Sequence, residues 1–479
     1  MNDVLTVLAL IGVGLGALPV LAGLAQFVLV PAHAVRNHYD RTGPYLPRVA
    51  VLVPAWNEAA VLTTTIERLM AQEYPPDRLR VVVVDDASTD DTPAVLAACA
   101  QRFPDRVVHL RRDVGGQGKA HTLNHGLAEL LSDDWMEALL ITDADVVFGP
   151  SALRKLTRHL ADPQVGAVTA YIREGSRDQQ MLTRSIAFDY LAAQAASRRA
   201  QQVAGAMACL AGGAQLHSRD NLLAIGGRID TSSLAEDTVT TFRTQLAGHT
   251  VVFEPHADVF AEEPASVDAL WRQRLRWARG NVQITRMYRH LWFRPSVHPG
   301  LGGVGFASFW FAITLMPVVM VTTSAGLLTL FALDRQLAGD VFGAAAFIPV
   351  AAFVFMVALT LSLDPQAARR IWPAALLFPG GISLAVLVVA VVPSLLDLTG
   401  AAATACTLFV YSWLALCMPA AWAVRRLEAT WAQPLVPVLV QLVGFGPLMC
   451  AITVDAFVKE FRGAAATWEK TEKVGRVLV

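Results

Sequence analysis

The sequence predicts an α/β domain with a mostly parallel β-sheet, inserted between transmembrane α-helices. The chain of 479 residues is 54% hydrophobic and 16% charged, with a mean hydropathy of +0.44, which is too apolar for an ordinary soluble protein. Its apolar runs gather at the two ends, whereas the middle alternates short β-rich runs with helical stretches. We therefore expect five parts: an N-terminal transmembrane helix (1–34), a cytosolic domain (35–285), an interfacial amphipathic segment (286–300), C-terminal transmembrane or re-entrant helices (301–457) and a cytosolic tail (458–479).

The N-terminal apolar run fixes the expected orientation. Residues 4–30 are nearly uncharged, long enough to cross a hydrocarbon core of roughly 30 Å. The run lacks the basic start of a signal peptide, so it predicts a retained helix. Arg36, Arg41 and Arg48 follow it and place the next domain in the cytosol. We expect a multi-pass protein of the plasma membrane.

Five apolar runs return after residue 302: 304–333, 342–363, 372–396, 401–424 and 434–457. Five crossings would leave the tail outside the cell, yet the tail is basic and looks cytosolic, with Lys459, Arg462, Lys470, Lys473 and Arg476. One run is therefore expected to be re-entrant or interfacial. The two candidates are the run broken at Pro379-Gly380-Gly381 and the last run, which is interrupted by Gln441, Gly444, Gly446 and Pro447.

The cytosolic domain begins with a βαβαβ pattern. Four β-rich, turn-bounded runs predict strands at 49–53, 80–84, 107–110 and 138–141, and helical periodicity predicts helices at 59–71 and 92–102. Such a parallel sheet binds its ligand beyond the carboxyl ends of the strands. Polar residues follow three of the strands and open a later helix-like stretch: Pro54, Asn57 and Glu58; Asp85 and Asp86; Asp143 and Asp145; Glu236 and Asp237.

Each of these acids also has an ordinary structural interpretation. Glu58 and Asp91 could be carboxylates at helix N-termini, and Asp85 or Asp86 could stabilise a turn. Their joint placement at strand ends favours a functional site. Nucleic acid is not expected as a partner, because the net charge is only -1. The five cysteines show no zinc or disulfide spacing.

The domain carries six short motifs in a fixed order: VLVPAWNE, VVVVDDASTDDT, GKAHTLNHG, TDADVVF, AEDTVTTFRTQLAGH and QRLRW. From residue 51 to about 280 they resemble the motifs of membrane-embedded family 2 glycosyltransferases, which include cellulose, hyaluronan, chitin and poly-N-acetylglucosamine synthases. The resemblance implies a GT-A-like fold and an inverting, metal-dependent hexosyltransferase that uses a UDP-sugar. The donor-binding residues that follow from it are Pro54, Asn57, Glu58, Asp85, Asp86, Lys119, Asp143, Asp145 and Gln273.

The diphosphate of a UDP-sugar needs a divalent cation. Mg²⁺ or Mn²⁺ prefers carboxylate and phosphate oxygens together with water. Asp143-Ala144-Asp145 is then a DxD motif, with Asp145 as the main metal ligand and Asp143 toward the nucleotide or sugar. Lys119 follows a Gly-rich stretch, but Asp113 and Ala120 stand where a Walker loop requires Gly and Ser or Thr. We expect Lys119 to reach the diphosphate, with a merely solvated lysine as the alternative.

The resemblance also assigns the catalytic and acceptor residues. Asp237 of the family's ED motif is expected to be the base, with Glu236 beside it, although both could merely favour a helix N-terminus. Gly212 and Gly213 are expected to place a backbone turn next to the acceptor sugar.

On a helix, Gln273, Arg276 and Trp277 share one face. Arg276 can stabilise the leaving UDP, and Trp277 offers a flat surface to an acceptor sugar. The neighbouring residues Arg272, Arg274 and Arg279 are expected mainly at the membrane interface, because they lie with Trp271 shortly before an apolar run. Residues 287–295 predict an amphipathic helix on the membrane surface.

Two functions fit these features. The first is processive synthesis of a β-linked polysaccharide, with N-acetylglucosamine or glucose favoured, passage through the C-terminal helices, and export subunits as candidate partners. The alternative is a single transfer to a membrane lipid acceptor. A transporter with a regulatory nucleotide-binding domain is disfavoured, because the apolar runs contain few ionisable residues.

Overall fold

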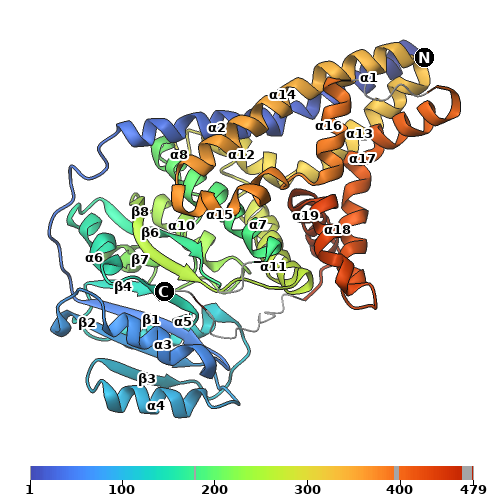
Figure 1. Cartoon of the computed structure of the whole chain (residues 1–479). Helices are drawn as coiled ribbons and strands as arrows, with labels where there is room; N and C mark the ends of the chain where they lie inside the picture. Colours follow the sequence, from blue (N-terminus) through green and yellow to red (C-terminus); the bar gives the residue numbers. More distant parts are fainter. Residues whose placement is uncertain (1, 177–179, 393–398, 466–476, 478–479) are drawn as a thin grey trace.

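A computed structural model of the chain describes residues 2–176, 180–392, 399–465 and 477. The basic tail residues Lys470, Lys473 and Arg476 lie outside the described residues, as does the end of the apolar run predicted at 372–396. The apolar helices gather on one side of the molecule, and the sheet with its covering helices lies on the other (Figure 1).

A single eight-stranded sheet organises the central part of the chain. Its strands are β1 (Val49–Ala55), β2 (Leu79–Asp85), β3 (Val107–Arg111), β4 (Ala138–Ile141), β5 (Val146–Phe148), β6 (Val165–Glu174), β7 (Gln215–Ser218) and β8 (Thr250–Ala261). They are arranged in the order β3-β2-β1-β4-β7-β6-β8-β5. Only β7 and β5 run against the other six strands. The predicted mostly parallel α/β sheet is confirmed, with four later strands that the sequence pattern did not predict.

Helices cover both faces of the sheet. They are α3 (Ala59–Met70), α4 (Thr92–Arg102), α5 (Lys119–Leu130), α6 (Ala152–Thr157), α7 (Met181–Tyr190), α8 (Ser197–Ala204), α9 (Arg219–Ala224), α10 (Glu236–Leu246) and α11 (Val267–Met287). Short 3₁₀ turns lie at η1 (Pro76–Arg78) and η2 (Arg158–Ala161), and η3 (Leu191–Ala196) is a π-helical turn. The helices predicted at 59–71 and 92–102 correspond to α3 and α4.

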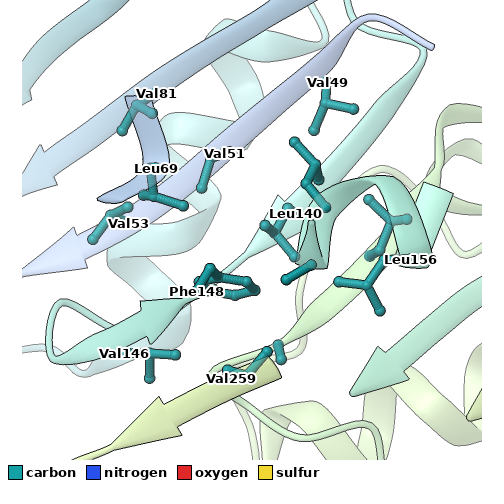
Figure 2. Close-up of a cluster of buried hydrophobic side chains, with 14 of the residues drawn as sticks. Val49, Val51, Val53, Leu69, Val81, Leu140, Val146, Phe148, Leu156 and Val259 are labelled. Atoms are coloured by element: carbon teal, nitrogen blue, oxygen red, sulfur yellow. The ribbon is translucent and has the colours of Figure 1, made fainter. Parts of the chain in front are cut away.

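Burial on both faces explains why the first strands are continuous apolar runs. Val51 and Val53 of β1 face the core under α3, where Leu69 packs (Figure 2). The alternate residue Leu52 faces α5 on the other side. A Cβ atom added to Gly126 of α5 would lie 2.5 Å from Leu52 Cδ1, so glycine lets this helix pack closely on the sheet. The close packing fixes α5, and with it Lys119 at its N-terminus.

The apolar segments form a second group of helices: α1 (Asn2–Leu15), α2 (Ala17–Val35), α12 (Val304–Thr314), α13 (Met316–Leu333), α14 (Arg335–Ser362), α15 (Pro365–Leu376), α16 (Gly381–Val391), α17 (Gly400–Leu427), η5 (Gln433–Leu435), α18 (Val436–Val443) and α19 (Phe445–Phe461). Within the described residues, four segments are long and apolar enough to span a membrane: Asn2–Val35, α13, α14 and α17. Two bent pairs raise the number to as many as six.

Both candidates for a re-entrant run are broken, at the residues that the sequence indicated. The α15–α16 pair bends by 70°, and the η5/α18 segment bends against α19 by 97°. Gly380 and Gly444 stand at the breaks with φ angles of +93° and +104°. A Cβ atom on Gly380 would lie 2.2 Å from the Val443 carbonyl oxygen, and the Gly446 N–H donates to the Phe378 carbonyl at 2.9 Å. The two breaks therefore cross each other, and only glycine fits there.

The prediction of an amphipathic helix at residues 287–295 is wrong. The helix α11 ends at Met287, and residues 288–303 form mainly consecutive turns. Tyr288 and Trp292 are buried around Phe242 with Trp310, so these aromatic rings pack inside the protein. Their packing against α10 and α12 fixes the connection between the sheet domain and the apolar helices.

Polar contacts hold α11 against the C-terminal helices. Two backbone N–H groups in its first turn donate to the Glu428 carboxylate at 2.8 and 2.7 Å. The fully buried Trp271 donates its indole N–H to Asp455 at 2.8 Å. Arg279, also buried, pairs with Glu460 at 2.6 Å. The prediction that Arg279 lies mainly at the membrane interface is therefore wrong, because α19 supplies its buried partner.

Part of the pH dependence of the stability should come from a buried histidine of the sheet. His217 of β7 is fully buried beside Asn221, and burial lowers its pKa to about 4. An unfolded chain binds this proton near pH 6.5, so the folded state loses up to ~3 kcal/mol as the pH falls from about 6.5 toward 4. We expect the unfolding temperature of the detergent-solubilised protein to fall in this window. The variant His217→Gln should have a flatter pH profile, and an unchanged profile would contradict this assignment.

Candidate active site

A cavity of about 440 Å³ opens at the edge of the sheet where β1, β2 and β4 end. This is the place that the parallel strand order predicts for a ligand. The cavity brings together predicted residues from every motif: Pro54, Glu58, Asp86, Lys119, Asp143, Asp145, Gly212, Gly213, Glu236, Asp237, Gln273, Arg276 and Trp277. The strand ends, the N-termini of α5 and α10, and one face of α11 supply them.

Two predicted donor-binding residues do not line the cavity. The Asp85 side chain is fully buried, where it pairs with Arg111 at 2.6 Å and accepts the Ser88 N–H at 2.8 Å. The Asn57 side chain accepts the Thr89 N–H at 2.8 Å and joins two loops. Their predicted contact with the donor finds no support in this arrangement, and the turn-stabilising interpretation fits Asp85.

Asp86 lies at the cavity and organises the loop before α5. Its carboxylate pairs with Arg112 and accepts the Gly116 N–H at 2.9 Å. A Cβ atom on Gly115 would lie only 2.0 Å from the Asp86 carbonyl oxygen. Only glycine at this position therefore lets the loop approach the Asp86 backbone so closely. The Gly-rich stretch before Lys119 therefore wraps around Asp86 and leads the chain into the cavity.

Lys119 sits among the carboxylates at the centre of the cavity. Its Nζ lies 2.5 Å from Asp143 Oδ1 and 3.7 Å from Glu236 Oε1, and donates to the Gly212 carbonyl at 3.2 Å. Burial acts to lower the pKa of Lys119, but Asp143 and Glu236 outweigh it, so the pKa lies above its ordinary value. The interpretation of Lys119 as a solvated side chain is excluded, because only 9% of the side chain is exposed.

The ED motif opens α10 and faces Lys119. Asp237 Oδ1 accepts the Thr238 N–H at 2.7 Å. Burial raises the pKa of Glu236, although Lys119 opposes the shift. A Cβ atom on Gly212 would lie 3.2 Å from Asp237 Oδ2 and 3.3 Å from Lys119 Nζ, so glycine keeps the space beside these groups open. Asp237 thus has a carboxylate oxygen at a gap that a reacting hydroxyl could occupy.

The helix α11 presents Gln273, Arg276 and Trp277 to the cavity, together with Arg274. Arg274 is buried, lies 2.9 Å from Asp189 and stacks its guanidinium 4.2 Å from the centre of the Trp277 ring. The prediction of Arg274 as an interfacial residue is therefore wrong. Arg272 is half-exposed and pairs with Asp268 at 3.6 Å.

The cavity is also lined by residues that were not predicted from the sequence, among them Tyr190, Arg198, Cys209 and Glu263. Tyr190 and Arg198 flank the π-helical turn η3, a type of distortion that occurs often at functional sites. Burial, together with the Asp237 charge, raises the pKa of the Cys209 thiol well above its ordinary value. Local sequence patterns carry no signal for these residues, because their positions depend on how α7, α8 and β8 pack around the cavity.

The carboxylates of the DxD motif suit a cation that is bound together with a ligand. Among the residues that the structure describes, no group of three or more His, Cys, Asp or Glu side chains is placed to hold a metal ion. Asp143 and Asp145 both line the cavity, and Lys119 engages one oxygen of Asp143. Two hard oxygen ligands fit Mg²⁺ or Mn²⁺ when a diphosphate and water complete the coordination. Asp145 would then be the main protein ligand.

The mostly parallel sheet, with an acid-lined cavity at the ends of its strands, is similar to the GT-A fold of a solved structure described below. Residues 47–280 match the family model described as glycosyltransferase like family 2. The chain therefore carries a family 2 glycosyltransferase domain, and its apolar helices fit a membrane protein.

Curated relatives and a solved structure agree with this class. The chain is 31% identical over 251 residues to the probable glycosyltransferase YdaM of Bacillus subtilis, covering 52% of this chain and 59% of the relative. It is 33% identical over 243 residues to a β-monoglucosyldiacylglycerol synthase of Synechocystis (50% and 49%), and 25% identical over 240 residues to a poly-β-1,6-N-acetyl-D-glucosamine synthase of Staphylococcus aureus (50% and 56%). The chain thus spans about half of the length of these relatives.

A solved structure is similar over most of the fold. It is a mannosyltransferase of Pyrobaculum calidifontis in complex with GDP-Man and Mn²⁺. The TM-score is 0.58 at 25% identity, and the match covers 76% of this chain and 99% of that one.

Proposed function

We propose that the protein is a metal-dependent, inverting hexosyltransferase that moves a sugar from a UDP-sugar to a growing β-linked polysaccharide at the cytosolic face of the plasma membrane. The observation that carries the proposal is Asp237 beside Lys119 and Gly212, in one cavity with the DxD carboxylates and Trp277. The relative named as a poly-N-acetylglucosamine synthase supports a polysaccharide product. N-acetylglucosamine and glucose are the favoured sugars.

The residues suggest a single displacement. The donor would place its nucleoside near Asp86 and its diphosphate near Asp145, where bound Mg²⁺ or Mn²⁺ would neutralise part of the phosphate charge. Asp237 takes the proton of the acceptor hydroxyl while that oxygen attacks the anomeric carbon. The bond from this carbon to the diphosphate breaks in the same step, and its electron pair leaves with UDP. Arg276 stabilises the departing charge, and the configuration is inverted because no sugar–enzyme bond forms.

A single transfer to a membrane lipid is the second candidate. The relative named as a β-monoglucosyldiacylglycerol synthase favours it, because that name describes a lipid that carries one sugar. The mannosyltransferase bound to GDP-Man adds guanosine donors to the set that must be tested. Both candidates use the same cavity residues, and they differ in the acceptor.

Nucleotide release by the purified protein tests the proposal. UDP-N-acetylglucosamine, UDP-glucose and GDP-mannose would each be supplied with Mg²⁺ or Mn²⁺, and product size would be measured in the same reactions. We expect UDP release from one favoured donor together with a ladder or a long polymer. One sugar per added lipid would instead establish the second candidate. Release of neither nucleotide under any condition would refute the proposed transfer.

Trp277→Ala should shorten the products or stop elongation. The indole ring lines the cavity one helical turn from Gln273, where it can stack on the acceptor sugar. Loss of one aromatic–sugar contact should weaken acceptor binding by roughly tenfold. Gel electrophoresis of the products gives the chain length. Trp372→Ala is the matched control, because Trp372 is 52% exposed on α15 outside the cavity. Products of normal length from the Trp277 variant would leave Trp277 as a packing residue.

A further inference from the structure

The cavity extends beyond the motif residues to a buried polar cluster near the end of β8. Tyr190, Glu263 and Gln273 line this part and are only 4%, 7% and 8% exposed. In the sheet, β1, β4, β7 and β6 separate β8 from β2, which leads to Asp86. The cluster therefore occupies a different part of the sheet edge from the predicted nucleoside end.

A chain of hydrogen bonds fixes the orientation of the Gln273 amide. The Tyr190 hydroxyl donates to Glu263 Oε1 at 2.8 Å, and the Gln273 amide nitrogen donates to Glu263 Oε2 at 3.4 Å. Burial and the Glu263 charge raise the pKa of Tyr190 well above its ordinary value, so the phenol stays a donor. Both carboxylate oxygens thus accept from neighbours. The opposite amide orientation would place the Gln273 oxygen against the carboxylate, which it cannot satisfy.

This orientation leaves one strong acceptor without a partner. Gln273 Oε1 is buried and accepts no hydrogen bond from the residues that the structure describes. A buried acceptor without a donor is costly, whereas a ligand hydroxyl would satisfy it. Gln273 lies one helical turn before Trp277, and both side chains line the cavity. A sugar ring stacked on an indole presents hydroxyl groups at its rim, where an amide oxygen can accept from them.

On the basis of the proposed glycosyl transfer, we propose that Gln273, which the family resemblance placed among the donor-binding residues, instead determines acceptor specificity by accepting a hydrogen bond from a hydroxyl of the acceptor sugar. Tyr190 and Glu263 are positioning residues that hold the Gln273 amide in this orientation. The acceptor therefore belongs to the class of molecules that end in a pyranose ring, whether that ring caps a polysaccharide or a glycolipid headgroup. A diacylglycerol without a sugar does not satisfy Gln273 in this way.

The choice of acceptor gives the first test. The probes are octyl β-glucoside and octyl β-N-acetylglucosaminide, compared with 1,2-dioctanoylglycerol at the same donor and metal concentrations. We expect kcat/KM to be at least about tenfold higher for one of the sugar-headed probes, the ratio that one satisfied hydrogen bond gives. Equal or better use of dioctanoylglycerol would overturn the inference and leave the proposed transfer standing. Absence of nucleotide release from every donor would instead refute the proposed transfer itself.

A double-mutant cycle tests the positioning role. Tyr190→Phe and Gln273→Met should each raise the KM for the sugar-headed acceptor by about tenfold, with less than about a twofold change in the KM for the donor. The double variant should be no worse than Gln273→Met, because Tyr190 acts through Gln273. Additive effects would overturn the positioning role.

Further variants protect the test against loss of folding. Glu263→Gln keeps the shape of the side chain, but its neutral amide is a weaker hydrogen-bond partner for the Tyr190 hydroxyl and the Gln273 amide. It should therefore also raise the KM for the sugar-headed acceptor. Tyr171→Phe is the matched control, because Tyr171 is 5% exposed but does not line the cavity. It should leave the acceptor KM unchanged. A rise equal to that of Tyr190→Phe would mean that loss of a buried hydroxyl acts through stability alone and would overturn the proposal.

Discussion

Asp237→Asn is expected to abolish glycosyl transfer while the protein still binds its donor. The amide cannot take a proton from the acceptor hydroxyl, and loss of a general base slows a reaction by about 10²–10⁴-fold. The fold should survive, because Asn retains the oxygen that accepts the Thr238 N–H at 2.7 Å. Calorimetric titration with UDP measures binding, and nucleotide release measures turnover.

The control for this variant makes the same chemical change elsewhere. Asp134 is fully exposed and pairs with Arg219 at 3.0 Å, and Asp134→Asn should leave both binding and turnover unchanged. Normal turnover by Asp237→Asn would move the base to another carboxylate, and Glu236 would be the next candidate because it lines the same cavity. Loss of UDP binding together with turnover would instead indicate a role in holding the donor.

The first four strands could be predicted from the sequence because most of them are buried on both faces of the sheet. Runs such as VVVV in β2 are then continuous and apolar, and the predicted ends fall within two residues of the observed ones. The strand β8 was not predicted, because Glu254 and His256 interrupt its apolar run. Glu254 is fully buried and pairs with Arg158 and His159, partners that only the fold brings close.

The sequence could not show which of two neighbouring residues of the same type faces the cavity. Asp85 and Asp86 are adjacent at the end of β2, where successive side chains point to opposite sides. Asp85 therefore turns into the protein toward Arg111, whereas Asp86 turns toward the cavity. Arg274 gave the same difficulty on α11, because its partner Asp189 lies far away in the sequence. The six motifs do meet at one cavity, but tertiary packing decides which of two neighbouring residues lines it.

Asp145→Asn is expected to cause the second large loss, and it acts through the cation. Even outer-shell partners of a metal change its affinity by about 10–100-fold, so loss of a direct carboxylate ligand should cost at least as much. Asp143→Asn is the informative comparison, because it breaks the 2.5 Å ion pair with Lys119 and should disturb donor binding even without a metal. Activity would be measured against Mn²⁺ and Mg²⁺ concentration, with Mn²⁺ binding in the presence of UDP followed by electron paramagnetic resonance. Because the two carboxylates have different neighbours, Asp145→Asn should shift the Mn²⁺ titration while UDP binding without metal is retained. An unshifted titration would contradict Asp145 as the metal ligand.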